Sequence, residues 1–229
     1  AACGAVAWAG KSRERVLLAP VGVREILEIL RDRRFLILLT ATALAWMSYG
    51  PYATFYTIHL ERLGLSRAFA GTAWALAALS ELLVMLLWPR LCGRAKPRTW
   101  LIVALAAHPI RWLLSSIAHG PVILLATQLT HAFTFGVLYL AAVQSVEGLV
   151  PDGLRTTAQG VFASVTFGLG GLVGSLLGGL LYEPMGMRAL YLASALVSAA
   201  ATLLYVMGSR GEQGAGRPSA PEAAQGGGR

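Results

Sequence analysis

The sequence predicts an all-α integral membrane protein, built as a bundle of six transmembrane helices. Of its 229 residues, 56% are hydrophobic and only 13% are charged, and the mean hydropathy is +0.62. A bilayer core about 30 Å thick requires roughly 20 apolar residues per helical span. The chain contains six such stretches, separated by polar segments, and we expect spans at residues 35–58, 68–89, 99–118, 121–146, 157–182 and 187–207.

Three regions are expected along the chain. In residues 1–34, the first nine residues are predicted to end an earlier membrane helix. An amphipathic linker at the membrane interface then follows, because Ile26, Leu27 and Leu30 recur at helical spacing beside charged residues. Residues 35–207 form the bundle. Residues 208–229 are rich in Gly, Ala and Pro and contain no large apolar residue, which predicts a disordered tail.

The distribution of basic residues predicts the orientation. The net charge of +8 could suit a nucleic-acid partner, but the basic residues flank apolar spans, so we expect no nucleic acid. By the positive-inside rule the protein should cross the cytoplasmic (inner) membrane several times with both termini of this chain cytoplasmic. That side would hold fifteen basic residues and the other side three: Arg62, Arg67 and Arg188.

Tyrosines recur on one face of the first span. Tyr49, Tyr52 and Tyr56 lie beside Pro51, which should kink the helix, and such breaks are tolerated where a neighbour or a cavity satisfies the freed carbonyl. Tyr49 and Tyr52 are therefore candidates for a substrate cavity. The alternative, an interfacial aromatic belt, suits Tyr56, which is nearer the outer end.

Ionisable residues inside spans are costly and are functional candidates by default. Glu81, in LAALSELLVMLLWPRL, lies roughly 20 Å from the outer end of the second span, and Arg111 lies roughly 10 Å from the outer end of the third. We expect these two side chains to pair first, since an unpaired charge in low dielectric is destabilising. Glu81 is the candidate for proton coupling. A pair that only locks two helices together is the alternative.

The fourth span carries a stripe of polar and aromatic side chains. Gln128, His131, Phe135 and Tyr139 follow one another at spacings of three, four and four, which places them on one helical face. His131, roughly 13 to 15 Å deep, titrates nearest neutral pH and could relay a proton, or it could simply hold two helices together. The stripe is predicted to line a solute pathway.

The fifth span is rich in small residues. Gly160, Ser164 and Gly168 form one row at four-residue spacing, and Gly170, Gly174 and Gly178 form a second. Small residues at this spacing allow helices to approach closely. We expect both rows to pack against other helices. These surfaces could also slide past one another during alternating access, which would give the packing a function.

Motifs for enzymes are absent from the sequence: it contains no G-x-S-x-G, no H-E-x-x-H, no P-loop and no carboxylate cluster with metal spacing. The two cysteines, Cys3 and Cys92, both fall on the predicted cytoplasmic side, where thiols stay reduced, so no disulfide is expected. The sequence therefore predicts no enzyme, no catalytic residue, no cofactor and no metal.

Several segments in order resemble the carboxyl-terminal half of a major facilitator superfamily carrier, nearest to the group of 3-phenylpropionate transporters and nucleoside:proton symporters. These are RDRRFLILL, FYTIHLERLGLS, WALAALSELLVMLLWPRL, HPIRW, and QLTHAFTFGVLYLAAV followed by P-x-x-x-R-x-x-A-Q-G. The resemblance implies twelve helices in two six-helix halves, so this chain would lack its amino-terminal partner half. It also implies that Glu81, Arg111 and His131 match polar positions of the family.

The predicted function is secondary active transport of a small organic solute, an aromatic acid or a nucleoside, coupled to protons with alternating access. A non-transporting membrane scaffold is the alternative. In a carrier, Gln128, His131 and Tyr139 should face one open cavity; in a scaffold they should be sealed against neighbouring helices.

Overall fold

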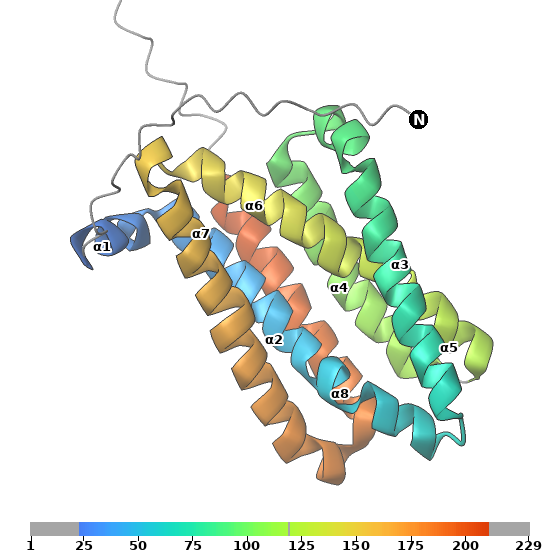
Figure 1. Ribbon diagram of the computed structural model, residues 1–229. Coiled ribbons are helices and arrows are strands. Elements are labelled where there is room, and N and C mark those ends of the chain that lie inside the picture. The colour runs from blue at the N-terminus through green and yellow to red at the C-terminus, as the bar shows by residue number, and fades with distance from the viewer. Residues whose placement is uncertain (1–22, 119, 211–229) are drawn as a thin grey trace, which may run out of the picture.

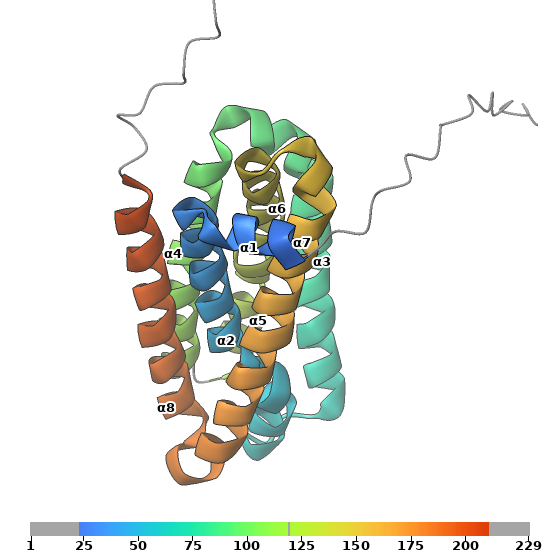
Figure 2. The same ribbon diagram turned by 90° about the vertical axis from the view of Figure 1, so that its left-hand side faces the viewer.

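The computed structural model describes residues 23–118 and 120–210, and these form an elongated bundle of helices (Figures 1 and 2). The predictions for residues 1–9, for Cys3 and for nearly all of the tail lie outside the described residues. Within the described chain five helical segments are long and apolar enough to cross a membrane, and the fifth is a run of 57 residues that folds back on itself. The predicted all-α bundle of six membrane passes is confirmed.

A short helix precedes the first pass. Helix α1 (Val23–Arg31) lies across one end of the bundle and contacts α2 and α7 (Figure 2). Ile29 is its buried side chain, whereas Leu27 is half exposed. Asp32 then caps α2 (Arg33–Arg62) by accepting hydrogen bonds from the backbone N–H groups of Arg34 and Phe35. The helix continues through Pro51 without interruption.

A short connection joins the second and third passes, which pack mainly against other helices rather than against each other. Ser66 caps α3 (Arg67–Leu91) by accepting a hydrogen bond from the N–H of Phe69. A 3₁₀ turn, η1 (Cys92–Arg94), leads to α4 (Pro97–Ile117), which begins at a proline whose missing N–H is no loss in the first helical turn.

The fourth pass is one membrane-length segment, Pro121–Leu149, as the sequence predicts, but its helix is interrupted by a turn near the middle. It consists of α5 (Pro121–Gln128), a turn, the π-helical segment η2 (Ala132–Val137) and α6 (Leu138–Leu149). π-helical turns inside membrane helices leave backbone groups displaced and occur frequently at functional sites. The break falls between Gln128 and His131, two residues of the predicted stripe.

The fifth and sixth passes are joined at one glycine. After the turn η3 (Asp152–Leu154) come α7 (Arg155–Ala163), the π-helical η4 (Ser164–Gly170) and α8 (Gly171–Gly208). Within α8 the backbone of Gly186 has φ +73° and ψ 167°, and the chain reverses direction there (Figure 1). A side chain would strain this conformation, so glycine is required at the turn.

Helix α2 and the first part of α8 run side by side with glycines between them. A Cβ at Gly170 would overlap Ala43, and one at Gly174 would overlap the carbonyl of Met47. Gly178 lies against Pro51 one turn further on. We call these three contacts the glycine seam. The other predicted row does not pack: a Cβ at Gly160 or Gly168 would meet no atom of the described chain within 4 Å.

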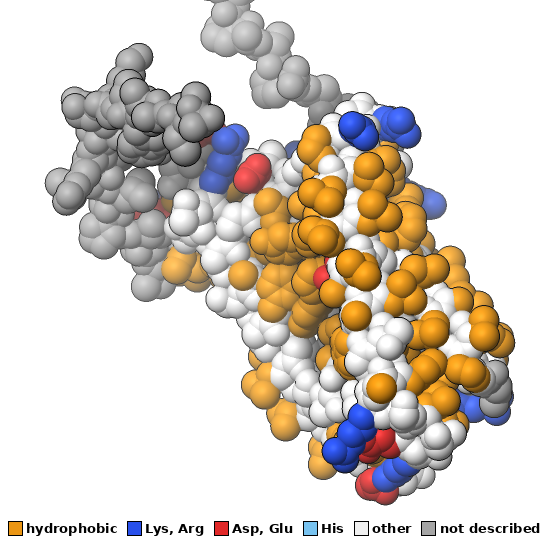
Figure 3. Space-filling model, turned by 45° about the vertical axis from the view of Figure 1, so that its right-hand side comes forward, with side chains coloured by type: hydrophobic (Ala, Val, Ile, Leu, Met, Phe, Trp, Pro, Cys, Tyr) orange, Lys and Arg blue, Asp and Glu red, His pale blue; other side chains and the backbone are white. Residues whose placement is uncertain are grey.

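The outer surface carries a broad apolar belt. Large hydrophobic side chains of α3 and α8 are exposed along the middle of the bundle (Figure 3). Such a surface is stable in hydrocarbon rather than in water. The protein is therefore a multi-pass membrane protein.

Candidate functional site

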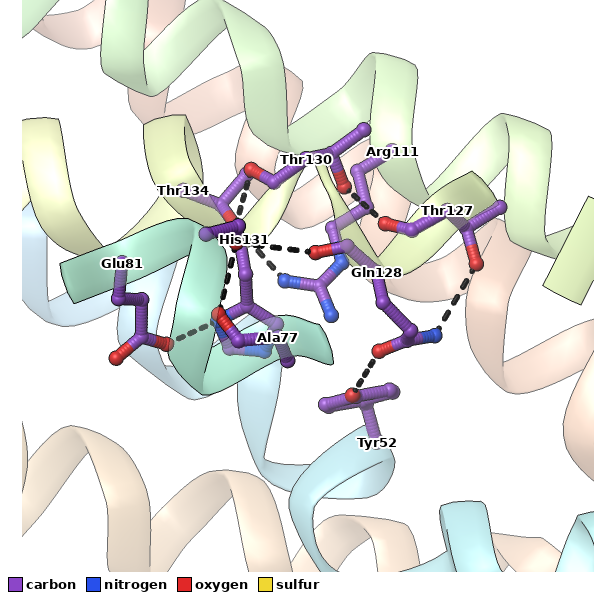
Figure 4. Close-up of polar contacts among 10 residues, drawn as sticks. Tyr52, Ala77, Glu81, Arg111, Thr127, Gln128, Thr130, His131 and Thr134 are labelled. Carbon is purple, nitrogen blue, oxygen red and sulfur yellow. Dashed lines mark hydrogen bonds and ion pairs between the residues drawn. The ribbon is translucent and has the colours of Figure 1, made fainter. Parts of the chain in front are cut away.

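The predicted site residues meet where α2, α3 and α4 surround the break in the fourth pass (Figure 4). We call the group of seven side chains at this point the polar cluster: Tyr52 and Tyr56 of α2, Glu81 of α3, Arg111 of α4, and Gln128, His131 and Thr134 of the broken pass.

Gln128 is clamped between two tyrosines. The hydroxyl of Tyr52 donates to Gln128 Oε1 at 2.6 Å, and Gln128 Nε2 donates to the hydroxyl of Tyr56 at 2.8 Å. All three side chains are buried. The alternative that placed Tyr56 in an interfacial belt is wrong, because its side chain is 1% exposed and its hydroxyl accepts a hydrogen bond from a buried amide. The spacing of four residues from Tyr52 was the signal that could have identified it.

Glu81 pairs with His131 and not with Arg111. Glu81 Oε1 lies 2.6 Å from His131 Nδ1, which is an ion-pair distance when the histidine is protonated. The angle does not suit a hydrogen bond, and neither ring nitrogen of His131 has a hydrogen-bond partner in the described part of the chain. The His131 side chain is 2% exposed and that of Glu81 is 21% exposed, so the pair opens to the surface on the carboxylate side. Gly136 lets η2 approach α3 here, since a Cβ at this position would overlap Val84. The predicted first pairing of Glu81 with Arg111 does not occur among the described ion pairs.

Arg111 is a buried cation held by a hydroxyl and by aromatic rings. Its NH1 donates to Thr134 Oγ1 at 2.8 Å, and its guanidinium carbon lies 4.5 Å from the ring centre of Tyr52 and 4.9 Å from that of Trp112. Its Nε and NH2 atoms have no hydrogen-bond partner in the described part of the chain. Aromatic faces offset part of the cost of a desolvated cation, but no described carboxylate lies within ion-pair distance.

An aromatic wall extends from the polar cluster toward the surface. Tyr49 of α2 contacts His131 edge-on at 5.6 Å between ring centres. Phe135 and Tyr139 of the fourth pass stack at 6.4 Å. Two further rings complete the wall and were missed from sequence: Trp46, which stacks on Tyr49 at 4.9 Å, and Phe167, which contacts Trp46 and Tyr139. Trp46 lies three residues before Tyr49, on the same helical face.

The predicted stripe has a buried part and an exposed part. Gln128 and His131 are sealed at 1% and 2% exposure, whereas Tyr139 is 39% exposed. Of the three side chains in the carrier criterion only Tyr139 is exposed, whereas Gln128 and His131 are closed over by neighbouring side chains, as the scaffold alternative predicts.

A family model described as the MFS_1 like family matches residues 5–193. The chain belongs to this family. The match confirms the predicted resemblance to major facilitator carriers and, with the relatives below, the prediction that the chain belongs with transporters rather than enzymes. Among the described residues of this MFS_1 like chain, no group of three or more metal-ligating side chains could hold an ion.

Curated relatives and a solved structure are transporters. The chain is 26% identical over 196 residues to the maltose permease of Geobacillus stearothermophilus, covering 84% of this chain and 49% of the relative. It is 28% identical over 167 residues to the putative nucleoside transporter YegT of Escherichia coli (strain K12), covering 70% and 39%. A crystal structure of a mutant of the nucleoside transporter NupG superposes with a TM-score of 0.72 at 17% identity, covering 87% of this chain and 54% of that one.

These coverages show that the chain spans about half the length of the curated relatives it matches, or somewhat less. The solved structure is likewise covered by about half, which agrees with the predicted fold of one half of a twelve-helix major facilitator protein.

Proposed function

We propose that this chain acts as the carboxyl-terminal half of a secondary active transporter that moves a small organic solute across the cytoplasmic membrane, with proton coupling and alternating access. The observation that carries the proposal is the Glu81–His131 pair, 2.6 Å apart and open to the surface at the carboxylate. A carboxylate and an imidazole this close titrate as a coupled pair, so in this proposal the pair gains or loses a proton when the carboxylate side is exposed to water.

Arg111 supplies a fixed positive charge beside this pair. Arg111 is buried among Tyr52, Trp112 and Thr134. In this proposal its charge therefore stays in the interior while the Glu81–His131 pair gains or loses a proton. Its unpartnered Nε and NH2 atoms offer two donors to a carboxylate that moves toward them. We propose that Glu81 exchanges its contact with His131 for one with Arg111 when the site changes access.

The aromatic wall is the proposed contact for the solute. Tyr139 is 39% exposed and stacks on the partly buried Phe135, so a planar solute ring could extend this stack at Tyr139. The names of the relatives include both a nucleoside and a sugar permease. An aromatic acid and a nucleoside both contain a ring of the required kind. Binding between two halves would need a second six-helix bundle facing this wall.

The test is solute uptake into vesicles that contain the full-length protein, driven by an imposed pH gradient. Radiolabelled nucleosides, aromatic acids and maltose form the solute panel. We expect uptake of a ring-containing solute that accelerates when the vesicle interior is alkaline, and loss of this pH dependence in Glu81→Gln. Glu183→Gln, which removes an exposed carboxylate at the far end of the bundle, is the matched control. Unchanged pH dependence in Glu81→Gln would reject proton coupling through this residue.

A non-transporting scaffold is the second candidate, and the burial of Gln128 and His131 favours it. The same uptake assay separates the two functions, because a scaffold accumulates no solute from the panel at any pH gradient.

A further inference from the structure

A cavity away from the polar cluster lies at the end of the bundle where α2 and α4 begin. Its volume is about 200 Å³. Four helices contribute to it: the first turns of α2 and α4 and the last turns of α6 and α8. Its polar lining consists of Arg34, Arg98, Gln144, Ser145 and Ser209, and no acidic residue is among the lining residues. The cavity therefore combines two guanidinium groups with neutral hydrogen-bonding groups.

Arg98 is oriented toward this cavity by a specific contact. Its Nε donates to Ser209 Oγ at 3.1 Å, and Ser209 in turn donates to the carbonyl of Tyr205 at 2.6 Å. In the described part of the chain this is the hydrogen bond that Arg98 makes, so its two terminal nitrogens remain for another acceptor. A planar pair of N–H donors fits a phosphate or carboxylate with two parallel bonds.

The remaining walls of the cavity are apolar. Ile37, Leu38, Leu149 and Tyr205 line it beside the polar groups. A free inorganic anion would leave these side chains against water, whereas an amphiphile with an anionic head would cover them. The cavity also lies at an end of the membrane-spanning helices, the depth at which lipid head groups lie.

The surrounding charge favours an anion. The basic end of the bundle, as we call it, carries ten described basic residues: Arg24, Arg31, Arg33, Arg34, Arg90, Arg94, Lys96, Arg98, Arg155 and Arg210. Arginines are paired with carboxylates at both ends, Arg155 with Asp152 at 2.8 Å at this end and Arg62 and Arg67 with glutamates at 2.7 Å at the other, so the basic end differs in the number of its basic residues. Basic pockets between membrane helices bind anionic head groups, with about 1 kcal/mol for each arginine near the surface.

We propose that this cavity is a binding site for the phosphate head group of an anionic phospholipid, held by Arg98 and Arg34. The acyl chains lie on the apolar outer surface of the bundle, and the ends of α2, α4, α6 and α8 are thereby linked through one lipid. This site is separate from the solute pathway and does not depend on transport.

The test is native mass spectrometry of the full chain, purified, stripped of lipid and titrated with phosphatidylglycerol or phosphatidylcholine of identical acyl chains. We expect one phosphatidylglycerol to bind at least tenfold more tightly than phosphatidylcholine. Arg98→Gln should weaken phosphatidylglycerol binding by about fivefold, and the double variant with Arg34→Gln by about twenty-five-fold. Arg155→Gln removes the same charge from an exposed ion pair at the same end and should change binding by less than about twofold.

Two further arms make the outcome decisive. Ser145→Phe fills the cavity without removing a charge, and Ser145 bonds only to a carbonyl of its own helix, so this variant tests the site even if Arg98→Gln fails to fold. Phosphatidylglycerol binding to Ser145→Phe with wild-type affinity, or equal losses in Arg98→Gln and Arg155→Gln, would overturn the proposal. Competition by glycerol 3-phosphate at the same concentration as the lipid would assign the cavity to a soluble phosphate and also overturn it.

Discussion

The glycine seam and the polar cluster lie on the same helix, α2, and hold the bundle together by different means. On the seam, α2 meets α8 without any side chain between the backbones at Gly170 and Gly174. At the polar cluster, α2 meets the fourth pass through the hydroxyls of Tyr52 and Tyr56 and the amide of Gln128. The three contacts of the seam depend on close backbone approach and contain no titratable side chain. The cluster depends on protons and hydrogen bonds, which can be exchanged.

The largest expected effect is a break of the seam. Gly174→Ala places a methyl group against the carbonyl of Met47, which must move for the variant to fold. We expect a loss of about 2 to 3 kcal/mol in the free energy of unfolding, typical of overpacking at a rigid contact. The measurement is thermal unfolding of the purified protein in detergent.

Gly160→Ala is the matched control for this prediction. The same methyl group meets no described atom at Gly160, and alanine favours a helix over glycine by about 0.5 to 1 kcal/mol. The control should therefore be as stable as the wild type or slightly more stable. If both variants lose the same stability, the seam is not a special contact and the comparison with the polar cluster fails.

The next effect is a break of the tyrosine clamp. Gln128→Leu keeps the size of the side chain but leaves the hydroxyls of Tyr52 and Tyr56 buried without their partner. An unsatisfied buried polar group costs about 1 to 3 kcal/mol, and we expect a loss within that range by the same unfolding assay. Tyr56→Phe, which removes one hydroxyl and leaves Gln128 its bond to Tyr52, should lose less. A Gln128→Leu variant as stable as the wild type would show that the clamp contributes nothing to stability.

A smaller effect on stability is expected from the proton pair. Glu81→Gln keeps a polar side chain near His131 but removes the carboxylate, so stability should change by less than about 1 kcal/mol, in the range of partly exposed ion pairs. The informative measurement is the dependence of the unfolding temperature on pH between 5 and 8. We expect this dependence to be weaker in Glu81→Gln than in the wild type and unchanged in Glu61→Gln, an exposed carboxylate paired with Arg67. Identical pH profiles in all three proteins would contradict a shared proton.

The sequence predicts these two regions to different extents, for physical reasons. The apolar spans and the row containing Gly174 follow from hydropathy and four-residue spacing, which are local properties of a helix. The row containing Gly160 has the same spacing but no neighbour, because the position of a partner helix is not a local property. The pairing of Glu81 with Arg111 was predicted from opposite charge and from depths within reach of two long side chains.

The contact of Glu81 with His131 depends on two features that no local pattern specifies. One is the break after Gln128, where no proline or glycine stands to predict it. The other is the close approach of η2 to α3 at Gly136, which brings the histidine to the carboxylate. The expected depths in the membrane favour this pair, because His131 is predicted to lie nearer the level of Glu81 than Arg111 does.

The smallest effect on stability should come from the outer end of the aromatic wall. Tyr139 is 39% exposed, and its ring contacts in the described part of the chain are with Phe135 and Phe167. We expect Tyr139→Ala to change the free energy of unfolding by about 0.5 kcal/mol or less, as for most surface positions. If the wall binds the solute, the same variant should raise the KM of uptake several-fold with folding intact. Tyr182→Ala, which removes a buried ring stacked on Phe55 away from the wall, should instead reduce stability and leave the KM of the remaining folded protein unchanged. Wild-type uptake by Tyr139→Ala would show that this ring does not bind the solute. The part of the site that changes during transport would then be the polar cluster, through its protons and hydrogen bonds.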